Sequence, residues 1–306
     1  MTLLTMDGGS KDITTTDKFK FLALNCGGYK ANSMYIDSLT NSYDCIFLNE
    51  LWITKAEEHL LNHYKSKFKS IFQPARKNHT GRPFGGTILL LRKESFQNTI
   101  TIMQEDFLTT VKASINNMQI LISGVYLQSI SSNTEHSDIY RSQLATLTGI
   151  TEQFSDSCQT IILGDFQSYP KVQNTTRIAQ QNSLSKYLTE FIEENEFNPI
   201  DITKGEGPVY TYQHVSLPNR SYIDHILTSN ELTAKTSETK VMEPSASNTG
   251  DHLPVTTTLN IQKSDPVKSK NQNEPNQQSQ LPNYVWYNKR FIDIYQNRVT
   301  SAIQQL

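Results

Sequence analysis

Short apolar segments recur along this chain, and they limit what it can fold into more than any other feature of the sequence. Each is seven to eleven residues long, is rich in Ile, Leu, Val, Phe and Thr, and is bounded by Gly, Asn, Asp or Pro, which is typical of β-strands. The predicted strands are residues 19–25, 44–50, 85–93, 118–128, 160–166, 221–229 and 252–261. The chain is therefore expected to fold around β-sheets.

Helical patterns separate some of these segments, while other segments are neighbours in the sequence. The spacing of apolar residues predicts helices at residues 33–40, 54–64, 138–154 and 183–194. This mixture fits two packed sheets better than one doubly wound sheet. We therefore predict an α/β protein, built as a four-layer sandwich of two packed mixed β-sheets flanked by helices.

The two ends of the chain differ from its middle. Residues 1–17 are polar and Thr-rich, and we expect a flexible leader there. One domain is predicted over residues 18–262, and residues 263–284, rich in Gln, Asn, Pro, Ser and Lys, read as a disordered linker. Residues 285–306 regain a helical stripe and predict an amphipathic helix. Such a helix could fold back on the domain, bind a partner, or begin a further region.

Composition excludes several classes of protein. Of the 306 residues, 36% are hydrophobic, which is enough for a core and rules out full disorder. No apolar run approaches the ~18 residues of a membrane-spanning helix, and the first residues do not resemble a signal peptide. The three cysteines are too few and too scattered for a disulfide framework or a zinc site, so we expect buried free thiols. We expect an intracellular protein with no membrane partner.

One stretch of the sequence carries charge of a single sign. Residues 64–93 hold eight Lys or Arg and no Asp or Glu, although the net charge of the whole chain is only -2. Such a run is either a solvated face or a surface for a phosphate-lined partner. The candidates for contact with a DNA backbone are Lys65, Lys67, Arg76, Lys77, Arg82 and Lys93.

Polar side chains stand at the ends of the predicted strands. Because strand ends of an α/β protein meet at one edge of the sheets, these side chains are expected to converge where ligands bind. The residues are Asn25, Glu50, Asp165, Gln167, Asp224, Asp251 and His252. Asn25, Glu50 and Asp251 supply the oxygen ligands that Mg²⁺ prefers. Taken singly, each residue is as easily explained as part of a turn.

The order and spacing of these motifs resemble the endonuclease/exonuclease/phosphatase family of Mg²⁺-dependent phosphoesterases. The motifs are LNCGG, LNELW, FGGTILLL, GVYLQS, ILGDFQS, SYIDHIL and GDHLPV, and the resemblance spans residues 19–261. Segments such as DFLTT and VYTYQHVSLPNRSYIDHIL, and the Trp-Tyr helix after a polar linker, resemble the endonucleases of LINE-type (non-LTR) retrotransposons.

The resemblance implies a role for each strand-end residue. Asn25 and Glu50 would hold Mg²⁺, for which Mn²⁺ may substitute, with Asp251 at or near its shell. Tyr126 would contact the scissile phosphate, and Asp165 would position or deprotonate the attacking water. Asp224 would orient His252, whose imidazole would stabilise the phosphorane-like oxygens.

The sequence departs from the family at Gln167, where the family has Asn. One more methylene moves the amide by about 1.5 Å, and misplacement near 1 Å can lower a rate on the order of 10²-fold. The backbone could instead retreat and leave the amide in place. The site is thus either active with an adjusted backbone or decayed.

Three functions follow from the resemblance. The first is a DNA endonuclease that nicks one strand and leaves a 3′-hydroxyl, as in retrotransposition, with a reverse transcriptase region or partner at the C-terminal helix. The second is a phosphatase or deadenylase of the same family. The third is a catalytically impaired nucleic-acid-binding or interaction module, which Gln167 favours. A eukaryotic retroelement protein would be nuclear.

Overall fold

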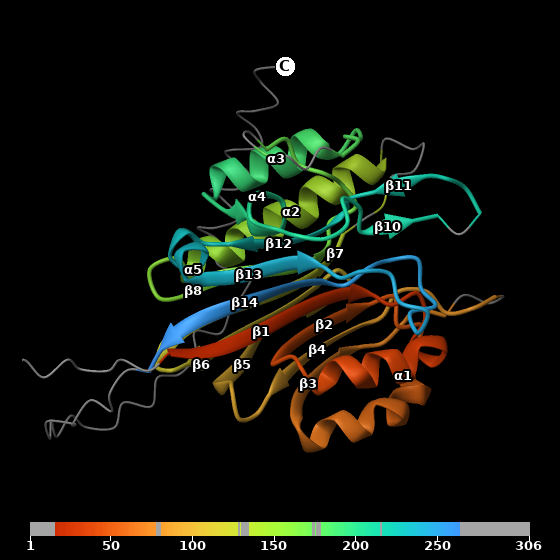
Figure 1. Ribbon diagram of the computed structural model, residues 1–306, viewed down its shortest axis with the longest axis horizontal. Helices are drawn as coiled ribbons and strands as arrows, with labels where there is room; N and C mark the ends of the chain where they lie inside the picture. Colours follow the sequence, from red (N-terminus) through yellow and green to blue (C-terminus); the bar gives the residue numbers. More distant parts are fainter. Residues whose placement is uncertain are drawn as a thin grey trace, which may run out of the picture. The chain divides into compact units, whose positions relative to one another are not determined.

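The computed structural model describes residues 16–77, 81–127, 129, 135–172, 175, 179–214 and 216–263 (Figure 1). Residues 264–284 of the predicted linker and the whole predicted C-terminal helix lie outside the described residues, as do residues 1–15 of the predicted leader. The first strand begins at Thr16, so the last two residues assigned to the leader already pair in a sheet.

The first sheet has six strands in the order β13-β14-β1-β2-β4-β3. Its strands are β1 (Thr16–Asn25), β2 (Cys45–Asn49), β3 (Phe68–Gln73), β4 (Thr87–Arg92), β13 (Thr236–Val241) and β14 (Val255–Gln262). Strands β1 and β2 are parallel and the other neighbours are antiparallel, so the sheet is mixed.

The second sheet also has six strands, in the order β5-β6-β7-β8-β12-β9. Its strands are β5 (Gln97–Glu105), β6 (Leu108–Ile115), β7 (Met118–Tyr126), β8 (Gln159–Asp165), β9 (Asn198–Pro199) and β12 (Asp224–Thr228). Here β7 and β8 are the parallel pair. A short hairpin of β10 (Tyr212–Gln213) and β11 (Arg220–Ser221) stands apart from both sheets.

Helices cover the outer faces of the two sheets (Figure 1). Those on the outer faces are α1 (Tyr29–Thr40), the 3-10 helix η1 (Lys55–Ser66), α2 (Glu135–Phe154) and α3 (Ser185–Glu194). The short helices α4 (Ile200–Thr203) and α5 (Asn230–Lys235) instead contribute side chains to the cluster between the sheets. Helix η1 begins with a capping box, in which Thr54 and Glu57 satisfy each other's backbone N–H groups. No helix among the described residues combines the length and apolar character needed to cross a membrane.

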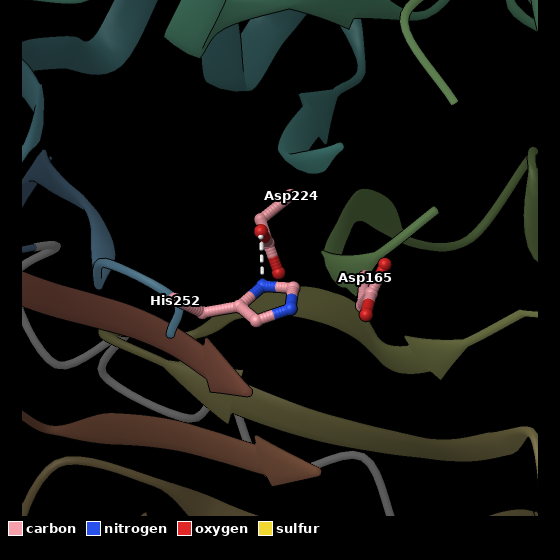
Figure 2. A group of neighbouring side chains, drawn as sticks. All are labelled: Asp165, Asp224 and His252. Atoms are coloured by element: carbon pink, nitrogen blue, oxygen red, sulfur yellow. Dashed lines mark hydrogen bonds and ion pairs between the residues drawn. The ribbon is translucent and has the colours of Figure 1, made fainter. Parts of the chain in front are cut away.

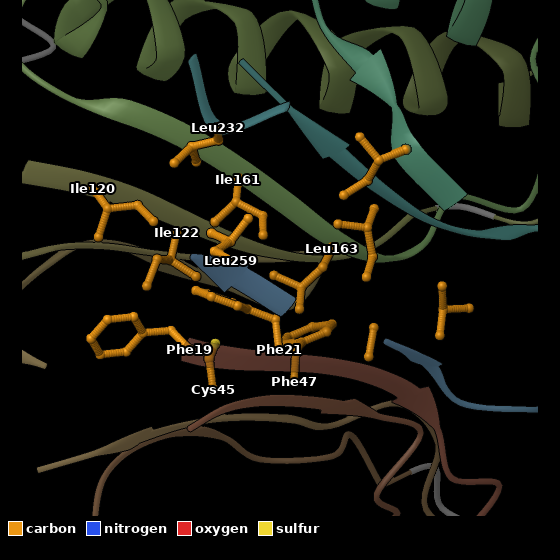
Figure 3. Close-up of a cluster of buried hydrophobic side chains, with 14 of the residues drawn as sticks. Phe19, Phe21, Cys45, Phe47, Ile120, Ile122, Ile161, Leu163, Leu232 and Leu259 are labelled. Carbon is orange, nitrogen blue, oxygen red and sulfur yellow. The ribbon is translucent and has the colours of Figure 1, made fainter. Parts of the chain in front are cut away.

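Three clusters of buried side chains hold the layers together. One fills the space between the sheets and includes Phe21, Phe47 and Leu163 (Figure 3). The second joins the second sheet to α2 and α3, and the third joins the first sheet to α1 and η1. The sheets approach closely at Gly124, where an added Cβ would lie 2.1 Å from the ring of Phe47. The predicted four-layer sandwich of two mixed sheets is confirmed.

All seven predicted strands are present, with ends that differ by a few residues. The predictions did not include β3, β5, β6 and β13. Three of these are edge strands and the fourth neighbours an edge. The three cysteines are buried free thiols, as predicted.

Candidate active site

Strand register places three of the predicted site residues in one row of the second sheet. Tyr126, at the end of β7, lies opposite Asp165 at the end of the parallel strand β8. Asp224, the first residue of the antiparallel strand β12, lies opposite Asp165 on the other side. A hydroxyl and two carboxylates therefore meet on neighbouring strands.

A hydrogen bond joins this row to the first sheet. Asn25, at the end of β1, donates from Nδ2 to Oδ2 of Asp165 over 3.1 Å. Asn25 is itself opposite Asn49, and Glu50 follows Asn49 at the end of β2. The two sheets thus bring their polar strand ends to one common edge, where the sequence predicted that these residues would converge.

The centre of the site is a buried group of two carboxylates and an imidazole (Figure 2). His252 Nδ1 lies 2.8 Å from Asp224 Oδ2, and both side chains are buried. Ligand atoms of Asp165, Asp224 and His252 all lie within 4.8 Å of one another. The other imidazole nitrogen, Nε2, has no hydrogen-bond partner among the described residues, and Asp165 lies beyond it in Figure 2.

Burial and mutual charge shift the pKa values in this group. Burial, and next the negative charge of Asp224, raise the pKa of Asp165 to about 7. Burial alone would lower the pKa of His252, but the charge and hydrogen bond of Asp224 outweigh burial and raise that pKa to about 9. Near neutral pH the group therefore offers a proton acceptor at Asp165 beside a cationic imidazole.

Glu50 is held by three donors at the same edge. Its carboxylate accepts hydrogen bonds from the Tyr126 hydroxyl and the Trp52 indole N–H, and one of 3.3 Å from the Gly85 N–H. Burial, followed by the charge of Glu50, raises the pKa of Tyr126 above its ordinary value. The hydroxyl of Tyr126 therefore stays a donor in the neutral pH range.

The loop before β14 brings Asp251 and His252 to the site. Asn32 of α1 fixes this loop, because its Oδ1 accepts from Thr249 N at 2.7 Å while its Nδ2 donates to Cys26 O at 2.6 Å. The half-buried Asp251 faces Gly27, whose added Cβ would lie 3.8 Å from Asp251 Oδ1. The sequence analysis did not single out Asn32, and no local motif marks it.

The predicted metal ligands and the buried carboxylate–imidazole group are different sets. In the part of the chain that is described, the potential ligands that cluster are Asp165, Asp224 and His252, without Glu50 or Asp251. In this cluster, His252 Nδ1 and Asp224 Oδ2 already bond to each other and are not available to a metal ion. The cluster therefore suits proton transfer. Oxygen donors suit Mg²⁺, and by donor type Glu50 and Asn25, with Asp251 nearby, fit such an ion.

Gln167 turns its side chain back onto Asp165. Its Nε2 donates to Asp165 Oδ2 at 2.7 Å, and its backbone N–H donates to Asp165 Oδ1 at 3.0 Å. The residue adopts a left-handed conformation, with φ of 58°. The amide therefore reaches the site, where it contacts the carboxylate.

The structure divides the predicted basic stretch between two ends of β3. Gln73, the last residue of β3, lies opposite Thr87, and Thr87 lies opposite Asn49, which precedes the site residue Glu50. Arg76, Lys77 and Arg82 come after Gln73 in the chain, so they lie at the site edge of the sheet. Lys65, Lys67 and Lys93 lie at the Phe68–Arg92 end, about 17 Å away for a six-residue strand.

The lysines at the far end contact the protein itself. Lys65 pairs with Glu58 at 3.6 Å, Lys67 donates to Asn41, and Lys93 donates to the carbonyl of Lys65. At the site edge Arg76 pairs with Asp106, while no carboxylate of the described residues pairs with Lys77 or Arg82. Within the described part of the chain, Lys77 and Arg82 are thus cations at the site edge without a carboxylate partner.

A second buried His–Asp pair was not predicted. His225 Nδ1 lies 2.8 Å from Asp201 Oδ2, and both side chains have no exposed surface. The sequence contains the neighbouring letters Asp-His at 224–225, but these two residues take different partners. Trp52, which contacts Glu50, was likewise missed.

Comparisons with known proteins agree with this fold. A family model described as Endonuclease-reverse transcriptase matches residues 120–256. The catalytic domain of Xenopus laevis APE2 is similar with a TM-score of 0.63 at 15% identity, covering 81% of this chain and 94% of that one. The endonuclease domain of TRAS1, a telomere-specific non-LTR retrotransposon, gives 0.58 at 12% identity, covering 81% and 100%.

A bacterial structure shares the same fold. A 3′-5′ exonuclease from Neisseria meningitidis gives a TM-score of 0.58 at 16% identity, covering 78% of this chain and 98% of that one. No curated protein matches this chain in sequence. The family model spans the segment with Asp165, Asp224 and His252. The resemblance is therefore confirmed: this chain has the endonuclease/exonuclease/phosphatase fold and resembles that family, with a non-LTR retrotransposon endonuclease among its structural relatives.

Proposed function

We propose that this protein is a divalent-metal-dependent phosphodiesterase and, more specifically, a Mg²⁺-dependent DNA endonuclease that nicks one strand and leaves a 3′-hydroxyl. The observation that supports it most is the buried Asp165 beside the His252–Asp224 pair, with Asn25 joining both sheets at that point. A proton acceptor with a pKa of about 7 next to a cationic imidazole suits hydrolysis at phosphorus.

In this proposal Asp165 accepts a proton from the attacking water. The water oxygen forms a bond to phosphorus as the bond to the 3′ oxygen breaks, and negative charge gathers on the other phosphate oxygens. His252 donates to those oxygens, and the Tyr126 hydroxyl donates to them after its single O–H leaves Glu50, because donors placed where charge develops stabilise the transition state. The departing 3′ oxygen takes up a proton from solvent to become the 3′-hydroxyl, and the phosphate stays on the 5′ end. Asp224 holds the imidazole by its Nδ1 and leaves Nε2 to face the substrate.

Asn25 and Glu50, with Asp251 nearby, are the residues proposed to hold Mg²⁺, and Mn²⁺ should replace it. When bound, the ion would neutralise charge on a phosphate oxygen and favour departure of the leaving oxygen. Glu50 is kept in place for this by the Trp52 indole N–H and the Gly85 N–H.

DNA is the proposed substrate for two reasons. The unpaired cations Lys77 and Arg82, and Arg76 beside them, stand at the site edge, where a phosphate backbone would pass. One structural relative is a 3′ phosphatase from Neisseria bound to a product DNA hairpin, and another is a retrotransposon endonuclease. Lys65, Lys67 and Lys93 would reach DNA only if it extended to the far end of β3. A reverse transcriptase partner for residues 285–306 remains a prediction that no observation tests.

A second candidate is an impaired module that binds nucleic acid without cleaving it. The amide of Gln167 is bonded to Asp165, and this observation favours that alternative. For the remaining alternative, a phosphatase or deadenylase of the same family, one structural relative is a 3′ phosphatase.

Incubation of the purified protein with supercoiled plasmid tests the proposal. We expect nicked circles with Mg²⁺ or Mn²⁺, none in excess EDTA, and ends that a DNA polymerase can extend. Glu50→Ala and Asp165→Ala should abolish nicking while circular dichroism shows an intact fold. Plasmid that is bound but stays supercoiled would favour the impaired module, and release of phosphate from 3′-phosphorylated oligonucleotides alone would favour the phosphatase.

A further inference from the structure

The turn after β2 has an unusual backbone. Glu50 and Trp52 are both left-handed, each with φ of 56°, a conformation that residues other than glycine rarely adopt. Four backbone hydrogen bonds hold it: Gly28 and Tyr29 donate to Glu50 and Leu51, and Leu51 and Trp52 donate to Gly86 and Gly85. Conformations of this kind persist where the surroundings impose them, commonly at functional sites.

The indole of Trp52 contacts two groups with different chemistry. Its N–H donates to Oε2 of Glu50. Its ring carries the Arg82 guanidinium, whose central carbon lies 3.9 Å from the ring centroid. Gly28 makes room for the ring, because a Cβ at that position would lie 2.4 Å from Trp52 Cε3. One side chain thus touches both a proposed metal ligand and an exposed cation.

Arg82 is an available anion-binding group. Its side chain is exposed, and no carboxylate of the described residues pairs with it. Stacking on an aromatic face leaves the guanidinium N–H groups pointing outward in its plane, where they can bind a phosphate in bidentate fashion. Arg76, only a few residues away, lacks this freedom because Asp106 neutralises it.

We propose that Trp52 is a positioning residue that sets the distance between Glu50 and Arg82, and that Arg82 binds a backbone phosphate next to the scissile one. This inference rests on the proposed function and adds a specificity-determining contact to it. A nucleic-acid strand with a phosphate on each side of the cleaved bond would satisfy both ends of the Glu50–Trp52–Arg82 unit. A substrate with a single terminal phosphate would engage only the Glu50 end.

Two substitutions separate the two halves of this unit. Trp52→Phe keeps an aromatic face for Arg82 and removes the N–H that holds Glu50. We expect its Mn²⁺ dissociation constant, measured by calorimetry, to rise about 10-fold, the low end of the range for loss of a partner of a metal ligand. Its affinity for a DNA duplex without divalent metal should stay within about twofold of wild type, because a stacked cation keeps its ring.

Arg82→Gln should produce the opposite result. Its Mn²⁺ affinity should equal that of wild type, while its metal-free DNA binding should weaken and the log–log salt slope should fall by about 0.9, the value for one phosphate contact. Lys112→Gln is the matched control, since Lys112 also lies over an aromatic ring, that of Phe154 at 5.7 Å, on a strand away from the site edge. It should change neither quantity.

Both readouts work whether or not the protein nicks DNA, so failure of the inference and failure of the proposed function are distinguishable. The inference is overturned if Trp52→Phe leaves Mn²⁺ affinity unchanged, or if Arg82→Gln leaves the salt slope unchanged. If Trp52→Phe does not fold, Gly28→Ala serves instead, because the added methyl displaces the indole and should weaken both Mn²⁺ and DNA binding. If folded Gly28→Ala keeps wild-type affinity for both Mn²⁺ and DNA, the inference is also refuted.

Discussion

The molecule contains two buried His–Asp pairs with the same contact and different surroundings. In each, Nδ1 of the histidine lies 2.8 Å from Oδ2 of the aspartate: His252 with Asp224 at the site edge, and His225 of β12 with Asp201 of α4. All four side chains are buried. The contact alone therefore does not decide which pair takes part in chemistry.

The second imidazole nitrogen separates the pairs. In His225, Nε2 lies 2.9 Å from the carbonyl oxygen of Ser168, and the ring stacks on Tyr222. Asp201 also accepts the backbone N–H of Ile226 at 2.8 Å. Every side-chain polar atom of this pair has a hydrogen-bond partner within the protein, so the pair has a structural role. The Nε2 of His252 has no such partner among the described residues, so it can act on a bound molecule.

The largest difference should come from removing the imidazole at the site edge. We expect His252→Ala to lower the nicking rate about 10³-fold, because a donor to the developing charge is lost. The variant should also lose unfolding free energy, because buried Asp224 is left without its partner, so the rate is compared per folded molecule. A rate above a tenth of wild type, measured by plasmid nicking, would show that His252 is not catalytic.

Removing the carboxylate of the structural pair should have the opposite outcome. Asp201→Ala leaves His225 without its partner inside the protein, and breaking such a buried pair costs about 3–5 kcal/mol of unfolding free energy. Urea unfolding measures this loss. The nicking rate per folded molecule should stay within about twofold of wild type, and a larger fall would mean that this pair also shapes the site.

Loss of the orienting carboxylate at the site should give an intermediate effect. In Asp224→Asn the amide cannot hold the imidazole cation, and loss of a partner that orients a functional histidine costs about 10- to 100-fold in activity. Single-turnover nicking with saturating DNA measures it. An unchanged rate would indicate that Asp165 alone fixes the imidazole.

The pH dependence of stability should follow the structural pair. Burial lowers the pKa of His225, but the charge and hydrogen bond of Asp201 outweigh it, so the folded-state pKa is raised above 6.5. The stabilisation is therefore complete below pH 6.5 and is lost as pH rises through the raised pKa. Between pH 6.5 and the raised folded-state pKa, the difference in unfolding free energy between wild type and His225→Gln should fall by about 1.4 kcal/mol per pH unit. If this difference does not change with pH, His225 is not stabilised as a cation by Asp201.

Among substitutions at the site, the smallest expected effect on the nicking rate concerns Gln167, which contacts Asp165 beside the His252–Asp224 pair. Gln167 donates to Asp165 at 2.7 Å, so its amide is not directed at a substrate. Gln167→Asn shortens the side chain, frees Asp165 and suits the left-handed backbone, and we expect nicking to rise about tenfold at unchanged DNA affinity. A lower rate would show that the backbone has adjusted to Gln.

The central strands and their polar ends could be predicted because the information is local. Strands β1, β2, β7 and β8 are buried on both faces and read as continuous apolar runs. The edge strands β3, β5 and β13 carry polar and charged residues, because many of their side chains are exposed or only half-buried. Their sequences therefore gave no clear strand signal.

The sequence by itself determined the sandwich and the set of polar strand ends, because strand propensity and turn residues act over a few neighbouring positions. Only the tertiary structure decided which partners they take. Asp224 and His225 are adjacent, yet successive side chains of a strand point to opposite faces, so they cannot share a site. Asp224 therefore meets His252, which is 28 residues later, and His225 meets Asp201. The same kind of geometry divided the basic stretch, because β3 carries Lys67 and Arg76 to opposite ends of a sheet.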